Sequence, residues 1–144
     1  MNKQLFTDLC DLLSTLEGLR WVDWDDGQLD TLDARQPIAL PSCMVDINLP
    51  ACDMVDDTTQ IVTGTVTLRF VFAPTGATNH LSPVRADALE TFDLMQAAHV
   101  LLQGWTNNYT HSPLQRTRAE REKRRDGLKV YRVTYSTTWY DMTE

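Results

Sequence analysis

Two stretches of sequence, LFTDLCDLLSTL at residues 5–16 and LMQAAHVLLQGW at residues 94–105, carry the same apolar pattern. In both stretches the apolar residues recur at offsets 0, 1, 4, 7, 8 and 11, which place them on one side of a helix. A helix with one apolar side must bury that side against another element of the fold. The two stretches therefore predict two amphipathic helices that cover one face of a sheet.

The strands of that sheet are predicted where apolar and polar residues alternate. In residues 59–73, one face carries valine, leucine and phenylalanine, whereas the other is rich in threonine. This alternation is typical of an antiparallel strand whose second face meets water or another subunit. We predict helices at residues 2–17 and 86–103, and strands at residues 20–24, 42–49, 59–73 and 128–140. The predicted fold is an α+β domain, in which a mostly antiparallel sheet of about four to five strands carries two amphipathic helices packed on one face.

The predicted connections are rich in proline, glycine and aspartate. Residues 25–41 form a long loop, either open or folded into a hairpin turn at Asp26–Gly27. Pro50 is predicted to end the second strand, because proline cannot donate a hydrogen bond to a neighbouring strand. An acidic turn with Asp53, Asp56 and Asp57 then follows, and a second loop is predicted at residues 74–83.

The size and composition predict one domain over residues 1–144 with an ample core, since 42% of the residues are apolar. Asp8 and Asp11 interrupt the first apolar stretch, unlike in a signal peptide, and no apolar run approaches the ~20 residues of a membrane span. We therefore expect a cytosolic protein without a membrane partner. The odd number of cysteines, Cys10, Cys43 and Cys52, is consistent with free thiols, and buried thiols are favoured over a disulfide between Cys43 and Cys52.

The residue types that carry chemistry do not form a recognisable site. The three histidines are scattered over two loops and a helix, without the convergent ligands that zinc requires. Asp23, Asp25 and Asp26 lack the glycine-centred loop of a calcium site, as do the later aspartates. Ser42 and Cys43 have no base or oxyanion hole placed near them, and phosphate-binding glycine loops are absent. We expect no catalytic residue, no cofactor and no metal.

The segment Arg116–Arg125 has no apolar face as a helix or as a strand. It is either an exposed edge strand or a mobile arm, and it forms a charged hairpin or arm over about residues 113–127. Asp126–Gly127 is predicted to be the turn into the last strand. The segment suits contact with DNA or with the acidic loop of a neighbouring subunit. Glu120 and Glu122 favour the protein contact, because they would repel phosphates.

Charge is segregated along the chain. The net charge of −7 argues against a general nucleic-acid binder, and the first sixty residues hold twelve acidic residues against three basic ones. A head-to-tail contact between an acidic surface and the basic segment would generate a ring or a filament. The candidate interface residues are Arg116, Arg118, Arg121, Lys123, Arg124, Arg125, Asp25, Asp26, Asp56 and Asp57.

The order of these elements resembles that of the tail-completion, or tail-terminator, proteins of tailed bacteriophages and prophages. The matching pieces are LFTDLCDLLSTL, LPSCMVDINLP, TTQIVTGTVTLRFVFAP, ALETFDLMQAAHVLLQGW and SPLQRTRAEREKRRDGLKVYRVTYSTTWYD. The resemblance implies a structural virion protein without catalytic residues. Its subunits would form a ring, commonly sixfold, that caps the tail tube or joins it to the head connector. The tail tube and connector proteins would be its partners, first in the host cytoplasm and then in the virion tail.

Two alternatives remain open from the sequence. The first is a nucleic-acid-associated protein that uses residues 116–125, for which a steep dependence of DNA affinity on salt would be the signature. The second is a small cation-dependent enzyme built on the acidic loops, for which stabilisation by Mg²⁺ or Mn²⁺ would be the signature.

Overall fold

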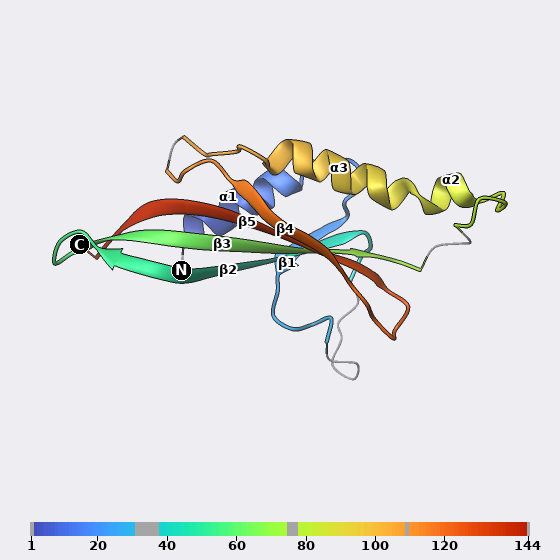
Figure 1. The fold of residues 1–144 in the computed structure, drawn as a ribbon, viewed down its shortest axis with the longest axis horizontal. Coiled ribbons are helices and arrows are strands. Elements are labelled where there is room, and N and C mark those ends of the chain that lie inside the picture. The colour runs from blue at the N-terminus through green and yellow to red at the C-terminus, as the bar shows by residue number, and fades with distance from the viewer. Residues whose placement is uncertain (1, 31–37, 75–77, 109, 144) are drawn as a thin grey trace.

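The computed structural model describes residues 2–30, 38–74, 78–108 and 110–143 (Figure 1). The helices and strands of these residues are, in order, α1 (Lys3–Leu13), β1 (Trp21–Trp24), β2 (Ser42–Met54), β3 (Thr59–Phe72), α2 (Arg85–Ala88), α3 (Glu90–Leu102), β4 (Gln115–Glu122) and β5 (Lys129–Met142). The strands form one sheet in the order β1-β2-β3-β5-β4, and α1 and α3 lie on one face of it. The predicted α+β fold, with a mostly antiparallel sheet and helices on one face, is confirmed.

The sheet is built around the long pair of β3 and β5. These antiparallel strands are in register from Phe72–Lys129 to Thr59–Met142, and β2 and β4 add antiparallel neighbours on either side. β1 is parallel to β2, so the chain between them crosses over and does not form a hairpin. Gly27 instead lies in a turn after β1, with φ of +79°. Residues 31–37 and 75–77 of the two predicted loops lie outside the described residues.

The main core lies between the helices and the sheet. α1 buries its apolar side as predicted, and α3 buries Ala98 and Leu102. Full burial of each large apolar side chain stabilises the fold by about 1.5–3 kcal/mol before the entropy of ordering is subtracted. On β3, Gly64 leaves the space that the ring of Trp139 occupies. The buried residues of this core include Leu5, Leu9, Leu13, Cys43, Val45, Val62, Val66, Leu68, Phe70, Leu102, Tyr135 and Trp139.

Both predicted helices differ from the structure in their extent. α1 ends at Leu13 rather than at residue 17, since the hydroxyls of Ser14 and Thr15 donate back to the carbonyl oxygens of the preceding turn. Gly18 then takes a left-handed conformation, with φ of +92°. The second predicted helix is divided into α2 and α3 at Leu89, whose ψ of −1° interrupts the regular helix. Gly104 follows α3 with φ of +79°, as expected for a residue after a helix end.

The predicted end of β2 at Pro50 is wrong. A register shift between Asn48 and Ala51 places the proline in an irregular part of the ladder, and the strand continues to Met54. A bulge can absorb a residue that lacks an N–H group, because the ladder is already interrupted there. Asp53 consequently belongs to β2, and only Asp56 and Asp57 lie in the turn before β3.

The face of the sheet away from the helices is mainly polar. Thr63, Thr65 and Thr67 lie partly exposed on this face of β3. At the end near β1, however, a second small core forms under the β1–β2 connection from Leu29, Met44, Val71 and Val130. The prediction of buried thiols holds for Cys43 but not for Cys52, which is exposed, and all three cysteines are free. Within the described residues, no helix combines the length and apolar content of a membrane span.

Candidate subunit interface

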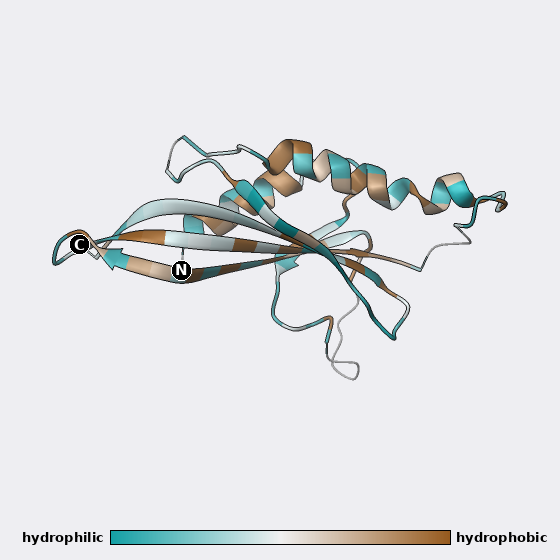
Figure 2. Ribbon diagram, viewed as in Figure 1, coloured by the Kyte–Doolittle hydropathy of each residue, from teal (hydrophilic) through white to brown (hydrophobic). Residues whose placement is uncertain are grey.

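The basic segment forms an exposed edge strand of the sheet. β4 pairs with β5 on one side only, and its side chains from Gln115 to Arg121 are all exposed. Asp126 and Gly127 lie in the turn that leads to β5, as predicted, so the hairpin is part of the sheet. Figure 2 shows β4 and the following turn as mainly hydrophilic. Charge along such an edge discourages uncontrolled pairing with other strands.

A bulge divides the arginines of β4 between the two faces of the sheet. Arg116 lies opposite Tyr135 and Arg121 opposite Tyr131, which face the helices. Arg118 lies opposite Thr134 on the polar face, where it forms an ion pair with Glu120 at 2.9 Å. The bulge falls between Arg116 and Arg118. The basic segment therefore presents two different charged surfaces.

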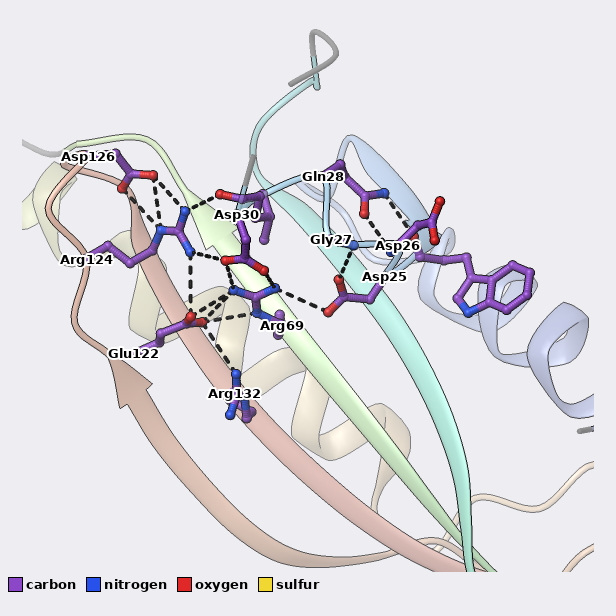
Figure 3. Close-up of polar contacts among 12 residues, drawn as sticks. Asp25, Asp26, Gly27, Gln28, Asp30, Arg69, Glu122, Arg124, Asp126 and Arg132 are labelled. Carbon is purple, nitrogen blue, oxygen red and sulfur yellow. Dashed lines mark hydrogen bonds and ion pairs between the residues drawn. The ribbon is translucent and has the colours of Figure 1, made fainter. Parts of the chain in front are cut away.

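A buried arginine on β3 organises the polar face (Figure 3). Arg69 is only 4% exposed, and its Nη2 donates to Glu122 Oε1 at 2.8 Å. Its Nη1 donates to Asp25 Oδ2 and to Asp30 Oδ2, each at 3.3 Å. Sequence reasoning missed this residue. The sequence pattern that could have indicated it is a single arginine on the threonine-rich face of a predicted strand.

Arg124 extends the same network into the β4–β5 turn. Its Nη1 donates to Asp30 Oδ1 at 3.1 Å, and its Nη2 donates to Asp126 Oδ2 at 2.7 Å and to the carbonyl oxygen of Leu29. Only 10% of its side chain is exposed. Of the candidate interface residues, Arg124 and Asp25 are thus committed to contacts within the subunit. Lys123, Arg125 and Asp26 are exposed.

The ion network shifts the protonation of its members. The hydrogen bond from Arg69 is the main cause that holds the pKa of Asp30 below its usual value, and Arg124 adds to the effect. Burial opposes the charge of Arg69, but hydrogen bonds to Asp30 and Glu122 outweigh it and raise the pKa of the guanidinium. Both groups therefore stay charged in the folded protein at neutral pH. The network ties the β1–β2 connection to β3 and to the hairpin.

This network predicts a loss of stability in acid. Because the pKa of Asp30 is lower in the folded than in the unfolded chain, its contribution is present above the unfolded value, near pH 4, and is lost as the pH falls through the folded value. Asp30→Asn is expected to reduce the difference in the free energy of unfolding between pH 7 and pH 3, as measured by urea denaturation. Asp26→Asn, in the same turn but pointing away from Arg69, is the control. Equal acid sensitivity in Asp30→Asn and the parent chain would contradict the prediction.

Among the residues that the structure describes, the acidic side chains of the loops have other partners. Asp25 contacts Arg69, whereas Asp56 accepts from the backbone N–H and the hydroxyl of Thr58, which lower its pKa. Among the described residues no group of three histidine, cysteine or acidic side chains could hold a metal ion.

The three histidines lie apart, and two of them contact other side chains. His99 Nδ1 lies 2.9 Å from the hydroxyl of Tyr135, and desolvation is the main cause that lowers its pKa, with Arg116 adding to it. Burial raises the pKa of Tyr135 to about 12. His111 is buried beside Thr137, whereas His80 is exposed in the loop before α2. Cys43 is also buried, and burial raises the pKa of its thiol. The thiol therefore stays protonated at neutral pH.

Comparison with known proteins gives a fold likeness. No protein-family model matches the sequence, and no curated protein matches it. Among solved structures, the chain is similar to a protein in the virion of a native gene transfer agent (GTA) particle, with a TM-score of 0.49 and 14% sequence identity. The match covers 90% of this chain and 82% of the other. The likeness is one of backbone arrangement.

Proposed function

We propose that this protein is a structural subunit of a tailed-phage or prophage virion, a tail-completion or tail-terminator protein without catalytic activity. Copies would assemble head to tail into a closed ring at the tail end or the head–tail junction. The tail tube and head-connector proteins would be its further partners, met in the host cytoplasm during assembly. The element order of helix, strand, hairpin, helix and hairpin supports the resemblance on which this role depends.

One observation carries the ring. The acidic β2–β3 hairpin and the basic strand β4 lie on either side of β5 in the sheet. Opposite charges at two different places on one subunit suit a contact between different surfaces of two copies. A contact of this kind repeats around an axis and closes into a ring when the rotation between neighbours divides a full turn.

Nucleic-acid binding is less well supported by the arrangement of the arginines. Arg124 is held by carboxylates within the subunit, and the polar face of β4 carries Glu120 and Glu122 beside Arg118. These carboxylates would oppose the approach of phosphates. A DNA affinity that falls steeply with salt would nevertheless revive this second candidate.

The ring predicts the mass of the particle in solution. Light scattering over a concentration series should show a closed oligomer of about six subunits, which weakens as salt screens the exposed charges. Measurements at low and moderate salt separate this charge-dependent assembly from apolar association. A monomer at every concentration and both salt levels would contradict self-assembly of the isolated protein.

A further inference from the structure

An acidic tongue extends past the helices at one end of the sheet, at the left of Figure 1. We define it as residues 51–62, the β2–β3 hairpin, together with residues 139–142 at the end of β5. All of its charged residues are acidic, namely Asp53, Asp56, Asp57 and Asp141. It also exposes large apolar side chains, namely Met54, Val55, Ile61, Tyr140 and Met142. Ile61 lies opposite Tyr140 on one face of the sheet, whereas Met54 lies opposite Gln60 on the other. Several exposed apolar side chains in one short segment are typical of an interaction surface.

A basic groove lies between α3 and β4, on the helix side of the sheet. It has a volume of about 180 Å³ and is lined by Phe92, Met95 and His99 of α3 and by Arg116 and Ala119 of β4. Phe92 is 58% exposed and packs edge-on against Tyr131, with ring centroids 6.4 Å apart. The groove is large enough to admit one apolar side chain.

The charges beside the groove are positive. Arg116 lines it, and Arg121 lies on the same face of β4, opposite Tyr131. Glu120 and Glu122 of the same strand point to the other face of the sheet, where Glu122 binds Arg69. The tongue and the groove are therefore complementary in two respects. Each offers exposed apolar side chains, and their charges are opposite.

Within one subunit the tongue and the groove lie at different places along the sheet: residues 59–62 pair with residues 139–142 in the tongue, whereas Phe70, Val133 and Tyr135, further along the same two strands, line the groove. Their complementarity consequently points to a second copy of the chain. We propose that the acidic tongue of one subunit docks into the basic α3–β4 groove of the next subunit. Met54 and Val55 supply the apolar centre of the contact, and the aspartates of the tongue pair with Arg116 and Arg121 around it. The proposal rests on the head-to-tail assembly proposed above and names the surfaces that make it.

The test uses one variant of each surface. Asp53→Arg with Asp57→Arg reverses the charge of the tongue. It leaves Asp56 unchanged, because the Asp56 side chain accepts a hydrogen bond from Thr58 in the turn. Arg116→Glu with Arg121→Glu reverses the charge beside the groove. Each double variant is expected to raise the dissociation constant of assembly at least tenfold, as measured by analytical ultracentrifugation. Circular dichroism should show that both still fold, since all four side chains are exposed.

Matched controls carry the same change of charge at other surfaces. Asp11→Arg with Glu17→Arg is the control for the tongue, and both residues are exposed at or near the end of α1. Arg118→Glu with Arg125→Glu is the control for the groove, because Arg118 lies on the opposite face of the same strand. Both controls should assemble like the parent chain. Loss of assembly in a control and not in its test variant would overturn the proposal.

Mixing the two test variants gives a sharper readout. The groove variant keeps an intact tongue and the tongue variant keeps an intact groove, so their mixture can form the native contact. The two reversed surfaces, an arginine tongue and a glutamate groove, are also opposite in charge and can form a charge-swapped contact. We expect assembly to reappear in the mixture, although each variant alone assembles poorly. A mixture that stays monomeric would overturn the tongue–groove contact.

The same experiment separates this contact from the proposed ring. A parent chain that forms a closed oligomer, with test variants that assemble equally well, would retain the ring and overturn the contact. A parent chain that forms open, growing polymers, abolished in both test variants, would retain the contact and overturn the closed ring. A parent chain that stays monomeric while the mixture shows no assembly would overturn both.

Discussion

Replacement of Arg69 by methionine is expected to lower the free energy of unfolding by about 3 kcal/mol. The substitution removes a cation that faces Glu122, Asp25 and Asp30 together, and it leaves their carboxylates close to one another on the polar face of the sheet. Methionine fills a similar length of the buried site, so the loss reports the missing charge more than a cavity. Urea denaturation at pH 7 would measure the change.

The control for this prediction is Arg118→Met. The Arg118 side chain is 69% exposed and pairs with Glu120 alone, so its loss should cost no more than about 0.5 kcal/mol. Arg69→Met combined with Glu122→Gln should be less destabilising than the sum of the two single changes, because the second removes a charge that the first leaves unpaired. Additive losses, or a small effect of Arg69→Met itself, would show that the network adds little to stability.

Gly64→Ala is expected to destabilise the protein by about 1–3 kcal/mol, although alanine is ordinarily well tolerated in proteins. A Cβ atom at position 64 would lie 2.2 Å from Cζ3 of Trp139, which is far inside van der Waals contact. Trp139 is nearly buried in the main core, so its ring can yield only by disturbing its neighbours. Thermal unfolding followed by circular dichroism would measure the loss.

A second substitution tests this explanation. Trp139→Leu removes the part of the ring that would collide, so Gly64→Ala should cost markedly less in the Trp139→Leu background than in the parent chain. The double-mutant cycle isolates the clash from the general cost of losing the tryptophan. An equal cost in both backgrounds would show that the loss of stability does not come from a clash with Trp139 but from another effect, for example on the backbone of β3.

The layout of helices and strands could be predicted because it follows from burial. The apolar stripe of residues 5–16 and the alternation of residues 59–73 are local patterns, and each is set by the single surface against which the segment packs. The continuation of β2 past Pro50 was not predictable in this way. A bulge depends on the strand that lies opposite, and the sequence around Pro50 carries no information on that partner.

In the candidate site, too, the features set by local sequence could be predicted and those set by the order of the strands could not. The charged hairpin and its turn at Asp126–Gly127 were predicted from local residues, and the edge-strand interpretation of β4 is confirmed. The network around Arg69 joins the β1–β2 connection, β3 and the β4–β5 hairpin, which are brought together only by the order of strands in the sheet. Without that order, Arg124 and Asp25 could only be grouped with the exposed charges of the chain.

The position of β5 between β3 and β4 has a consequence for the speed of folding. The long β3–β5 ladder joins residues that are dozens of positions apart, and α2, α3 and β4 all lie between them in the sequence. For these strands to pair, a large loop must close, and its entropic cost comes before the stabilising contacts form. We therefore infer that the protein folds slowly. Until β5 arrives, the inner edge of β3 is open and β4 has no neighbour. The hairpin of β2 and β3, by contrast, is local and is suited to form first.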